Sequence, residues 1–167
     1  NIPWITSKSL GQSIYLTTGE KTVSEEAVRK SATHIVPANN LIFATRVGVG
    51  KVVVTKIDVA ISQDSTGIVV DSNEIDPTFL ALQLRSDEIQ RFVTQNKRGA
   101  TIQGITRTSL QQIEISLPPL PEQRRIAHIL STVQRAIEQQ AQLIALTREL
   151  KSALMHKLFS EGLHGEK

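Results

Sequence analysis

The stretch IEISLPPLPEQRRIAHILSTVQRAIEQQAQLIALTRELKSALMHKLFSEG, residues 113–162, decides how this chain is organised. Apolar and polar residues alternate from Ile113 to Leu117, which is the period of a half-buried β-strand. Three prolines between Pro118 and Pro121 then end the strand, because proline donates no backbone hydrogen bond to a sheet. The pattern predicts a short strand, a proline hinge and a helix.

The helix predicted after this hinge is unusually long. Pro121 suits the first helical position, because its fixed φ is helical and the N–H that it lacks would have no partner there. Glu122 follows in the first turn, where a negative charge favours the helix dipole. No Gly or Pro then occurs before Gly162, the first plausible stop. About 40 residues at roughly 1.5 Å each give a helix of about 60 Å.

Apolar residues recur along this helix at steps of three and four, which places them in one stripe. A helix of this length cannot bury such a stripe against one small domain, so we expect a second helix to pair with it. The expected pairing residues are Ile126, Ile129, Leu130, Val133, Ile137, Ile144, Leu150, Leu154 and Leu158.

The preceding residues are typical of a strand-rich α+β globule. Two β-branched runs, Leu41–Val47 and Lys51–Ile57, flank a short glycine-containing link and predict a hairpin. Asp76 and Pro77 have the side chains of a helix cap and a first helical residue. We therefore expect a globule at residues 1–117 and a hinge with a long helix at 118–167. Since the chain opens directly with IPWIT, we expect the start of the globule to be missing.

Composition excludes a few classes of protein and leaves others open. The chain has 167 residues, a net charge of +3 and no cysteine. The absence of cysteine excludes disulfides and thiolate metal sites and fits a reducing cytoplasm, where we place the protein. No apolar run is long enough for a membrane helix. The mild basic bias permits a nucleic-acid partner and equally fits an ordinary solvated surface.

Signatures of catalysis are absent from the sequence. Gly48–Lys51 lacks the spacing of a phosphate-binding loop, and Val52 stands where the metal-binding hydroxyl would be. The four histidines are scattered without metal-ligand spacing. Gln63–Gly67 sets a carboxylate beside hydroxyls, but these residue types indicate a turn. We predict a non-catalytic binding protein without a metal or cofactor of its own.

A resemblance to a known family indicates what the chain is expected to bind. The string ISLPPLPEQRRIAHIL, followed by a helix ending LMHKLFSEG, resembles the conserved spacer region of Type I restriction–modification specificity subunits. Earlier stretches resemble successive parts of a target recognition domain of that family: IPWITSKSL, LIFATRVGVGKV, AISQDSTGIVV and RGATIQGITRTSLQQIEISLPPL. The resemblance covers nearly the whole chain. A complete subunit of the family has two recognition domains and two spacers, and this chain has one of each.

The resemblance implies a division of labour. A recognition domain reads one half of a bipartite double-stranded DNA target, and the spacer helix sets the separation of the halves. Modification subunits, which carry S-adenosylmethionine-dependent adenine methylation, would bind the specificity subunit, and restriction subunits would join the full complex. On this view the chain carries specificity and no active site.

Three polar segments are the candidates for DNA contact once this family is considered. The loop Lys97–Arg107 is cationic and contains two glycines, which let a backbone come close to another surface. Arg46 or Arg107 would suit guanine, and Gln103 adenine. Without the resemblance, the loop also fits an ordinary surface role. The expected DNA-binding residues are Thr6, Ser7, Lys8, Thr45, Arg46, Gly48, Gly50, Lys51, Lys97, Arg98, Thr101, Gln103 and Arg107.

Two alternatives remain open from the sequence. A half-size specificity protein would form a homodimer through the long helix and read a symmetric target. A coiled-coil scaffold, from another functional class, would bind protein through its globule. Salt-dependent binding to duplex DNA separates DNA reading from a scaffold role.

Overall fold

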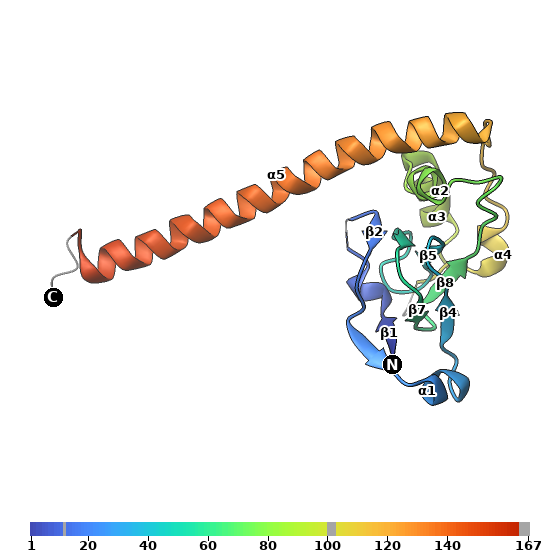
Figure 1. Cartoon of the computed structure of the whole chain (residues 1–167), viewed down its shortest axis with the longest axis horizontal. Coiled ribbons are helices and arrows are strands. Elements are labelled where there is room, and N and C mark those ends of the chain that lie inside the picture. Colours follow the sequence, from blue (N-terminus) through green and yellow to red (C-terminus); the bar gives the residue numbers. More distant parts are fainter. Residues whose placement is uncertain (12, 100–102, 164–167) are drawn as a thin grey trace. The chain divides into compact units, whose positions relative to one another are not determined.

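A computed structural model describes residues 1–11, 13–99 and 103–163 of the chain. The chain divides into two compact units, Asn1–Ser131 and Thr132–Lys167. Helix α5, Leu120–Glu161, begins in the first unit and supplies the helical part of the second. The first unit contains two mixed β-sheets and the remaining helices, so the α+β class predicted from the sequence is confirmed (Figure 1).

Two four-stranded sheets form the body of the first unit. The first sheet has the order β3-β1-β7-β4, and its β1 and β7 are parallel. The second has the order β2-β6-β5-β8, and its β2 and β6 are parallel. The strands of the first are β1 Ile2–Ile5, β3 Lys21–Val23, β4 His34–Val36 and β7 Val59–Ile61; those of the second are β2 Tyr15–Leu16, β5 Leu41–Ala44, β6 Val52–Thr55 and β8 Ser65–Ile68.

The second sheet lies between two hydrophobic layers, which explains its continuous apolar strands. In β5, Leu41 and Phe43 belong to a cluster that includes the helix residues Leu80, Leu84, Ile89 and Val93. The alternate residues Ile42 and Ala44 belong to a second cluster with residues of the first sheet. A strand buried on both faces needs apolar residues at every position, as β5 has. The predicted β5–β6 hairpin is confirmed.

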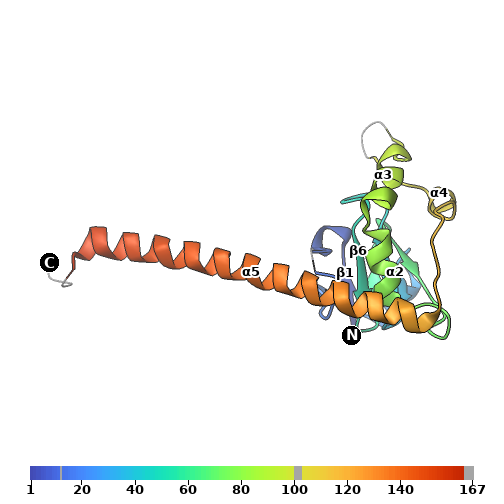
Figure 2. The ribbon, with the colours of Figure 1, turned by 90° about the horizontal axis from the view of Figure 1, so that it is seen from above.

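Two helices cover the outer face of the second sheet (Figure 2). Helix α2, Pro77–Leu84, is capped by Asp76, whose carboxylate accepts from the backbone N–H of Phe79 at 2.9 Å. Helix α3, Asp87–Gln95, is capped by Ser86. The remaining short helices are the 3₁₀ turn η1 Ser7–Ser9, α1 Glu25–Arg29 and α4 Arg107–Leu110.

The strand predicted at Ile113–Leu117 is wrong. This segment has no regular secondary structure and pairs with no strand of the described residues. Ile113 and Ile115 are partly buried against the first hydrophobic cluster, while Glu114 and Ser116 are exposed. The alternation from Ile113 to Ser116 therefore reflects alternate burial of an unpaired segment, which a sequence pattern cannot distinguish from strand pairing, and Leu117 is exposed.

Helix α5 follows the sequence prediction closely. It has 42 residues, with Glu122 in its first turn. It ends before Gly162, whose φ of 73° is the left-handed value that terminates helices. Its buried residues are Gln123, Ala127 and Ser131, all of which lie in the first compact unit. The first compact unit thus includes the beginning of α5.

The expected pairing residues of α5 are exposed in the single chain. Ile126 is half-buried, and the other eight are between 45 and 61 % exposed. Isolated apolar side chains on a surface are common, but a stripe of them along one helix is typical of an interaction surface. Among the residues that the structure describes, no helix combines the length and apolarity that a membrane crossing requires.

Candidate nucleic-acid interface

Backbone hydrogen bonds join two of the segments that the sequence analysis singled out. Arg98 and Gly104 exchange two backbone bonds, of 2.8 and 2.9 Å, which close the base of the Lys97–Arg107 loop. The N–H of Ile105 then donates to the carbonyl of Thr45, at 2.8 Å, just beyond β5. The base of the loop is therefore fixed beside the turn of the β5–β6 hairpin.

Gly104 makes this close approach possible. A Cβ atom at this position would lie 2.9 Å from the backbone oxygen of Thr45 and 3.4 Å from Cγ of Arg46. The first distance is shorter than real Cβ contacts, and a backbone oxygen cannot turn aside as a flexible side chain can. The loop and the hairpin therefore require glycine where they meet.

The junction forms a hollow of about 530 Å³ that we call the arginine pocket. Arg46 comes from the hairpin, Arg98 from the base of the loop, and Arg107 from the first turn of α4. Polar side chains from the β7–β8 turn and from the α4 cap complete it. The lining residues are Thr45, Arg46, Gln63, Thr66, Arg98, Gly104, Ile105, Thr106 and Arg107.

The arginine pocket carries uncompensated positive charge. Within the described part of the chain, the ion pairs are Glu25–Arg29 and Glu26–Lys30, both on α1 and its cap. None of the three arginines of the pocket therefore has a carboxylate partner there. All three are exposed, so their guanidinium groups are available to a ligand. A guanidinium offers five N–H donors in a planar fork and no acceptor, which suits phosphate or the acceptor edge of guanine.

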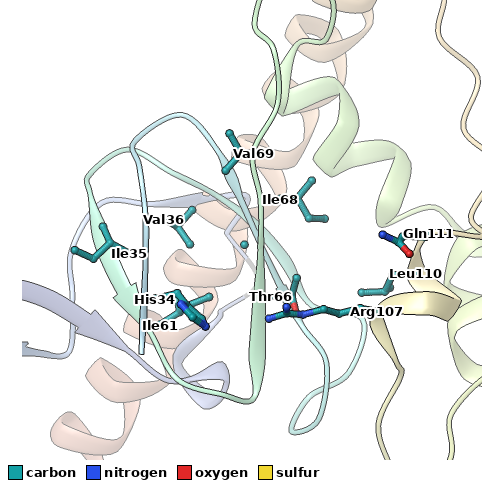
Figure 3. A pocket seen from close by; sticks show the side chains of 11 residues that line it. His34, Ile35, Val36, Ile61, Thr66, Ile68, Val69, Arg107, Leu110 and Gln111 are labelled. Carbon is teal, nitrogen blue, oxygen red and sulfur yellow. The ribbon is translucent and has the colours of Figure 1, made fainter. Parts of the chain in front are cut away.

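A second hollow, of about 540 Å³, adjoins the arginine pocket and shares Thr66 and Arg107 with it (Figure 3). We call it the apolar hollow. It lies where β4 and β8, the edge strands of the two sheets, meet α4. Gly67 allows these edges to approach, because a Cβ there would lie 2.6 Å from Cγ2 of Val36. Its lining residues are His34, Ile35, Val36, Ile61, Thr66, Gly67, Ile68, Val69, Arg107, Leu110 and Gln111.

The other predicted residues of the hairpin and the loop lie outside the pocket lining. Gly48 and Gly50 have φ of 68° and 95° in the hairpin turn, and Lys51 after them is exposed. Gly50 also accepts a hydrogen bond from Nε2 of Gln90 at 2.9 Å, which holds the turn against α3. In the loop, Lys97 is half-buried and Gln103 is exposed, whereas Thr101 lies outside the described residues.

Two predicted contact residues have buried side chains. Ser7 is 1 % exposed, between Thr6, which donates to Glu20 at 3.0 Å, and the exposed Lys8. Thr45 is 7 % exposed, and its hydroxyl donates to the backbone oxygen of Asp64 at 3.1 Å. The residues Thr6–Lys8 do not line either hollow. Polar residue type alone does not show which hydroxyls a fold buries.

Several polar residues of the two hollows are not identified by sequence reasoning. Gln63 and Thr66 belong to a segment whose residue types indicate only a turn. Thr106 gives no separate signal in the sequence, because its side chain also caps α4 by accepting from the N–H of Ser109 at 3.1 Å. His34 lies far from the arginines in sequence, and Gln111 follows Arg107 at the end of α4 without a pattern that marks either residue as part of a site. No group of three or more His, Asp or Glu side chains in the described ranges could hold a metal ion.

Comparison with known proteins identifies the family. The family model described as "Type I restriction modification DNA specificity domain" matches residues 1–148. The chain is 26 % identical over 140 residues to the MjaIX specificity subunit of Methanocaldococcus jannaschii, covering 83 % of this chain and 32 % of that protein. It is 28 % identical over 135 residues to the EcoR124I/EcoR124II specificity subunit of Escherichia coli, covering 78 and 33 % respectively. The chain thus spans about a third of these curated relatives.

Solved structures agree with this result. The S subunit of a Type I restriction–modification system from M. genitalium superposes with a TM-score of 0.62 at 26 % identity, over 99 % of this chain and 44 % of that one. The HsdS subunit from Thermoanaerobacter tengcongensis has the same fold, with a TM-score of 0.62 at 19 % identity over 98 % of this chain and 38 % of that one. The relatives are named specificity subunits, as expected for a non-catalytic chain. The chain belongs to the Type I restriction–modification DNA specificity family.

Proposed function

We propose that the globular unit reads one half of a bipartite DNA target, and that the arginine pocket is the centre of its DNA contact. One observation carries this proposal: Arg46, Arg98 and Arg107 converge from three separate segments without a carboxylate partner among the described residues. Such a cluster repels itself unless an anion lies against it. The phosphate backbone of DNA supplies that anion, and counterion release favours its binding.

The polar residues around the arginines give the surface its capacity for sequence reading. Phosphate contacts fix the position of a protein on a duplex, whereas contacts to base edges read its sequence. Arg46 or Arg107 can bind O6 and N7 of guanine together, and Gln63 or Gln111 can bind the N6 and N7 edge of adenine. The adjoining apolar hollow offers isoleucine and valine side chains, which suit the methyl group of thymine.

The long helix has a separate role in this proposal. Its exposed apolar stripe pairs with a second spacer helix, either in a longer subunit or in a second copy of the chain. Both arrangements hold two recognition domains at a fixed separation on DNA. Modification subunits that carry S-adenosylmethionine would bind this assembly and methylate the target, and restriction subunits would join them. The chain itself supplies no catalytic residue.

The experiment that tests this function is selection of sequences from a randomised duplex pool by the full-length protein, with and without its modification subunit. We expect one sequence to be enriched, and its affinity to fall steeply as salt rises. Binding without enrichment would make the chain a non-specific DNA-binding protein. No binding at low salt in either assembly would contradict DNA reading and favour the protein-scaffold alternative.

A further inference from the structure

The start of α5 is held by one polar side chain. Gln123 is 1 % exposed, although glutamine is among the residues that are mostly exposed in proteins. Its Oε1 accepts from the backbone N–H of Asp76 at 3.0 Å. Its Nε2 donates to the carbonyls of Glu74 at 3.0 Å and Pro118 at 2.8 Å. The oxygen and both amide hydrogens are therefore used.

These partners fix which way the amide group points. In the reverse orientation, the NH₂ group would face the N–H of Asp76 and the oxygen would face two carbonyls. Each of these two contacts would place donor against donor or acceptor against acceptor. Every buried group involved would then lack a hydrogen-bond partner, and its desolvation would not be compensated. The three hydrogen bonds thus act together, and no one of them can be made in the flipped rotamer.

Gln123 joins α5 to two segments, one of which is far from it in sequence. Glu74 lies in the loop before α2, Pro118 lies in the proline hinge, and Asp76 is the cap of α2. The side chain of Asp76 caps α2 through Phe79, while its own N–H is satisfied by Gln123. The first turn of α5 therefore completes the amino-terminal cap of α2. The two views of the chain agree in placing the beginning of α5 beside α2 (Figures 1 and 2).

Apolar packing at this contact is small, so the polar bonds dominate it. The buried residues of α5 are Gln123, Ala127 and Ser131, which lie four residues apart on one face of the helix. Alanine and serine allow close approach but bury little apolar surface. No large apolar side chain of α5 is fully buried, and Ile126 is only half-buried. The contact is specific because its polar groups match.

We propose that Gln123 is the positioning residue of the spacer helix: it fixes the first turns of α5 to the cap of α2 and so sets the separation at which the helix holds a second recognition domain. This inference rests on the proposed function. The expected ligand is duplex DNA with two half-sites at one preferred spacing.

The first test needs no DNA. Gln123→Met fills the same volume without any hydrogen-bonding group, and Gln139→Met makes the same change at an exposed position of the helix. Amide exchange followed by NMR reports on Asp76 directly. We expect its N–H to exchange at least about tenfold faster in Gln123→Met than in Gln139→Met. Equal exchange rates at Asp76 in the two variants would contradict the proposal that Gln123 holds α5 to the cap of α2.

A milder variant keeps the test decisive if Gln123→Met does not fold. Gln123→Asn retains the amide on a side chain one methylene shorter, so it reaches only some of the three partners. Its Asp76 exchange rate is expected to lie above the wild-type rate. A wild-type rate in folded Gln123→Asn would show that the amide bonds do not hold this contact, and would overturn the proposal.

The second test separates positioning from simple stability. Duplexes carrying two copies of the enriched sequence, with the intervening spacer varied one base pair at a time, give a spacing profile for the full-length protein. We expect the wild type and Gln139→Met to prefer one spacing, and Gln123→Met to bind neighbouring spacings to within about threefold. Affinity that falls equally at all spacings would reduce Gln123 to a structural residue. A wild type that enriches no sequence would defeat the proposed function, while the Asp76 exchange result would still stand.

Discussion

The backbone N–H of Ile105 donates to the carbonyl of Thr45 at 2.8 Å, joining segments that are distant in sequence. Ile105 is 5 % exposed and belongs to the hydrophobic cluster beneath the helices, so this bond is anchored in the core. It fixes the loop that contains Arg98 next to the hairpin that contains Arg46. This well-protected backbone hydrogen bond thus helps to bring Arg98 and Arg46 into the lining of one pocket.

Replacing Gly104 tests how closely the loop and the hairpin must approach. Gly104→Ala places a methyl group 2.9 Å from the backbone oxygen of Thr45, so the loop must move away from the hairpin. We expect the free energy of unfolding to fall by about 1–3 kcal/mol, as measured by chemical denaturation, and DNA affinity to fall with it. The matched control is Gly11→Ala, where the nearest atom would lie 4.0 Å from the new Cβ and stability should change little. Equal stability of the two variants would show that the junction tolerates a side chain.

Removal of single guanidinium groups tests the arginine pocket. Arg46→Ala, Arg98→Ala and Arg107→Ala should each weaken binding to the selected duplex. An arginine that binds phosphate contributes about one unit to the slope of affinity against salt, so its removal lowers the slope by that amount. An arginine that binds guanine contributes about 1–3 kcal/mol, and its removal relaxes specificity at one base pair. Titrations at several salt concentrations distinguish the two cases.

The control for these variants is Arg91→Ala, an exposed arginine on α3 that does not line the pocket. Replacement of Arg46, Arg98 or Arg107 by lysine adds a second comparison, because lysine keeps the charge but lacks the planar fork. A lysine variant should lose recognition of a base and should keep binding to a phosphate. Affinity unchanged in all three alanine variants would remove this pocket from the DNA-binding surface.

The half-buried Arg85 is expected to be structural. Its Nε donates to the carbonyl of Val52 at 2.8 Å, and its Nη2 donates to the carbonyl of Ser13 at 2.7 Å, so it ties the end of α2 to the second sheet. Arg85→Met keeps much of the aliphatic volume and leaves these carbonyls without their charged donor. We expect a decrease of about 1.5–3 kcal/mol in the free energy of unfolding. The paired control, Arg91→Met, should stay close to wild type; a similar decrease there would point to a general effect of removing arginine.

Helix pairing is tested at Leu150, which is 59 % exposed in the single chain. Leu150→Asp would bury an unpaired carboxylate in the expected seam, and such a charge is strongly unfavourable. Sedimentation of a protein that self-associates should show the association constant reduced by about tenfold or more. Ser152→Asp adds the same charge at a polar position of α5 and should associate normally. Undiminished association of Leu150→Asp would place the seam on another face of α5.

Much of the local structure was predictable because it depends on neighbouring residues. Asp76 and Pro77 predicted a helix start, and Gly162 predicted a helix end, since capping and left-handed φ are local requirements. The strand predicted at Ile113–Leu117 was wrong because strand formation is not a local property. Alternating burial reports the two faces of a segment, whereas strand pairing depends on a partner elsewhere in the chain.

The candidate site was predictable only in fragments. Arg46, Arg98 and Arg107 were named from two separate polar segments, but their convergence required the Arg98–Gly104 bridge and the Ile105–Thr45 bond. The burial of Ser7 and Thr45 could not be predicted either, because a hydroxyl that the fold buries has the same residue type as one that faces a ligand.

The sequence by itself determined the long helix, the strand-rich globule before it and the family, because periodicity, caps and ordered motifs are properties of neighbouring residues. The tertiary structure alone decided which charges meet and how the helix is anchored. Gln123 shows why: its three partners lie in the loop before α2, in the α2 cap and in the hinge, and only the folded chain brings a donor or acceptor from each within hydrogen-bonding distance.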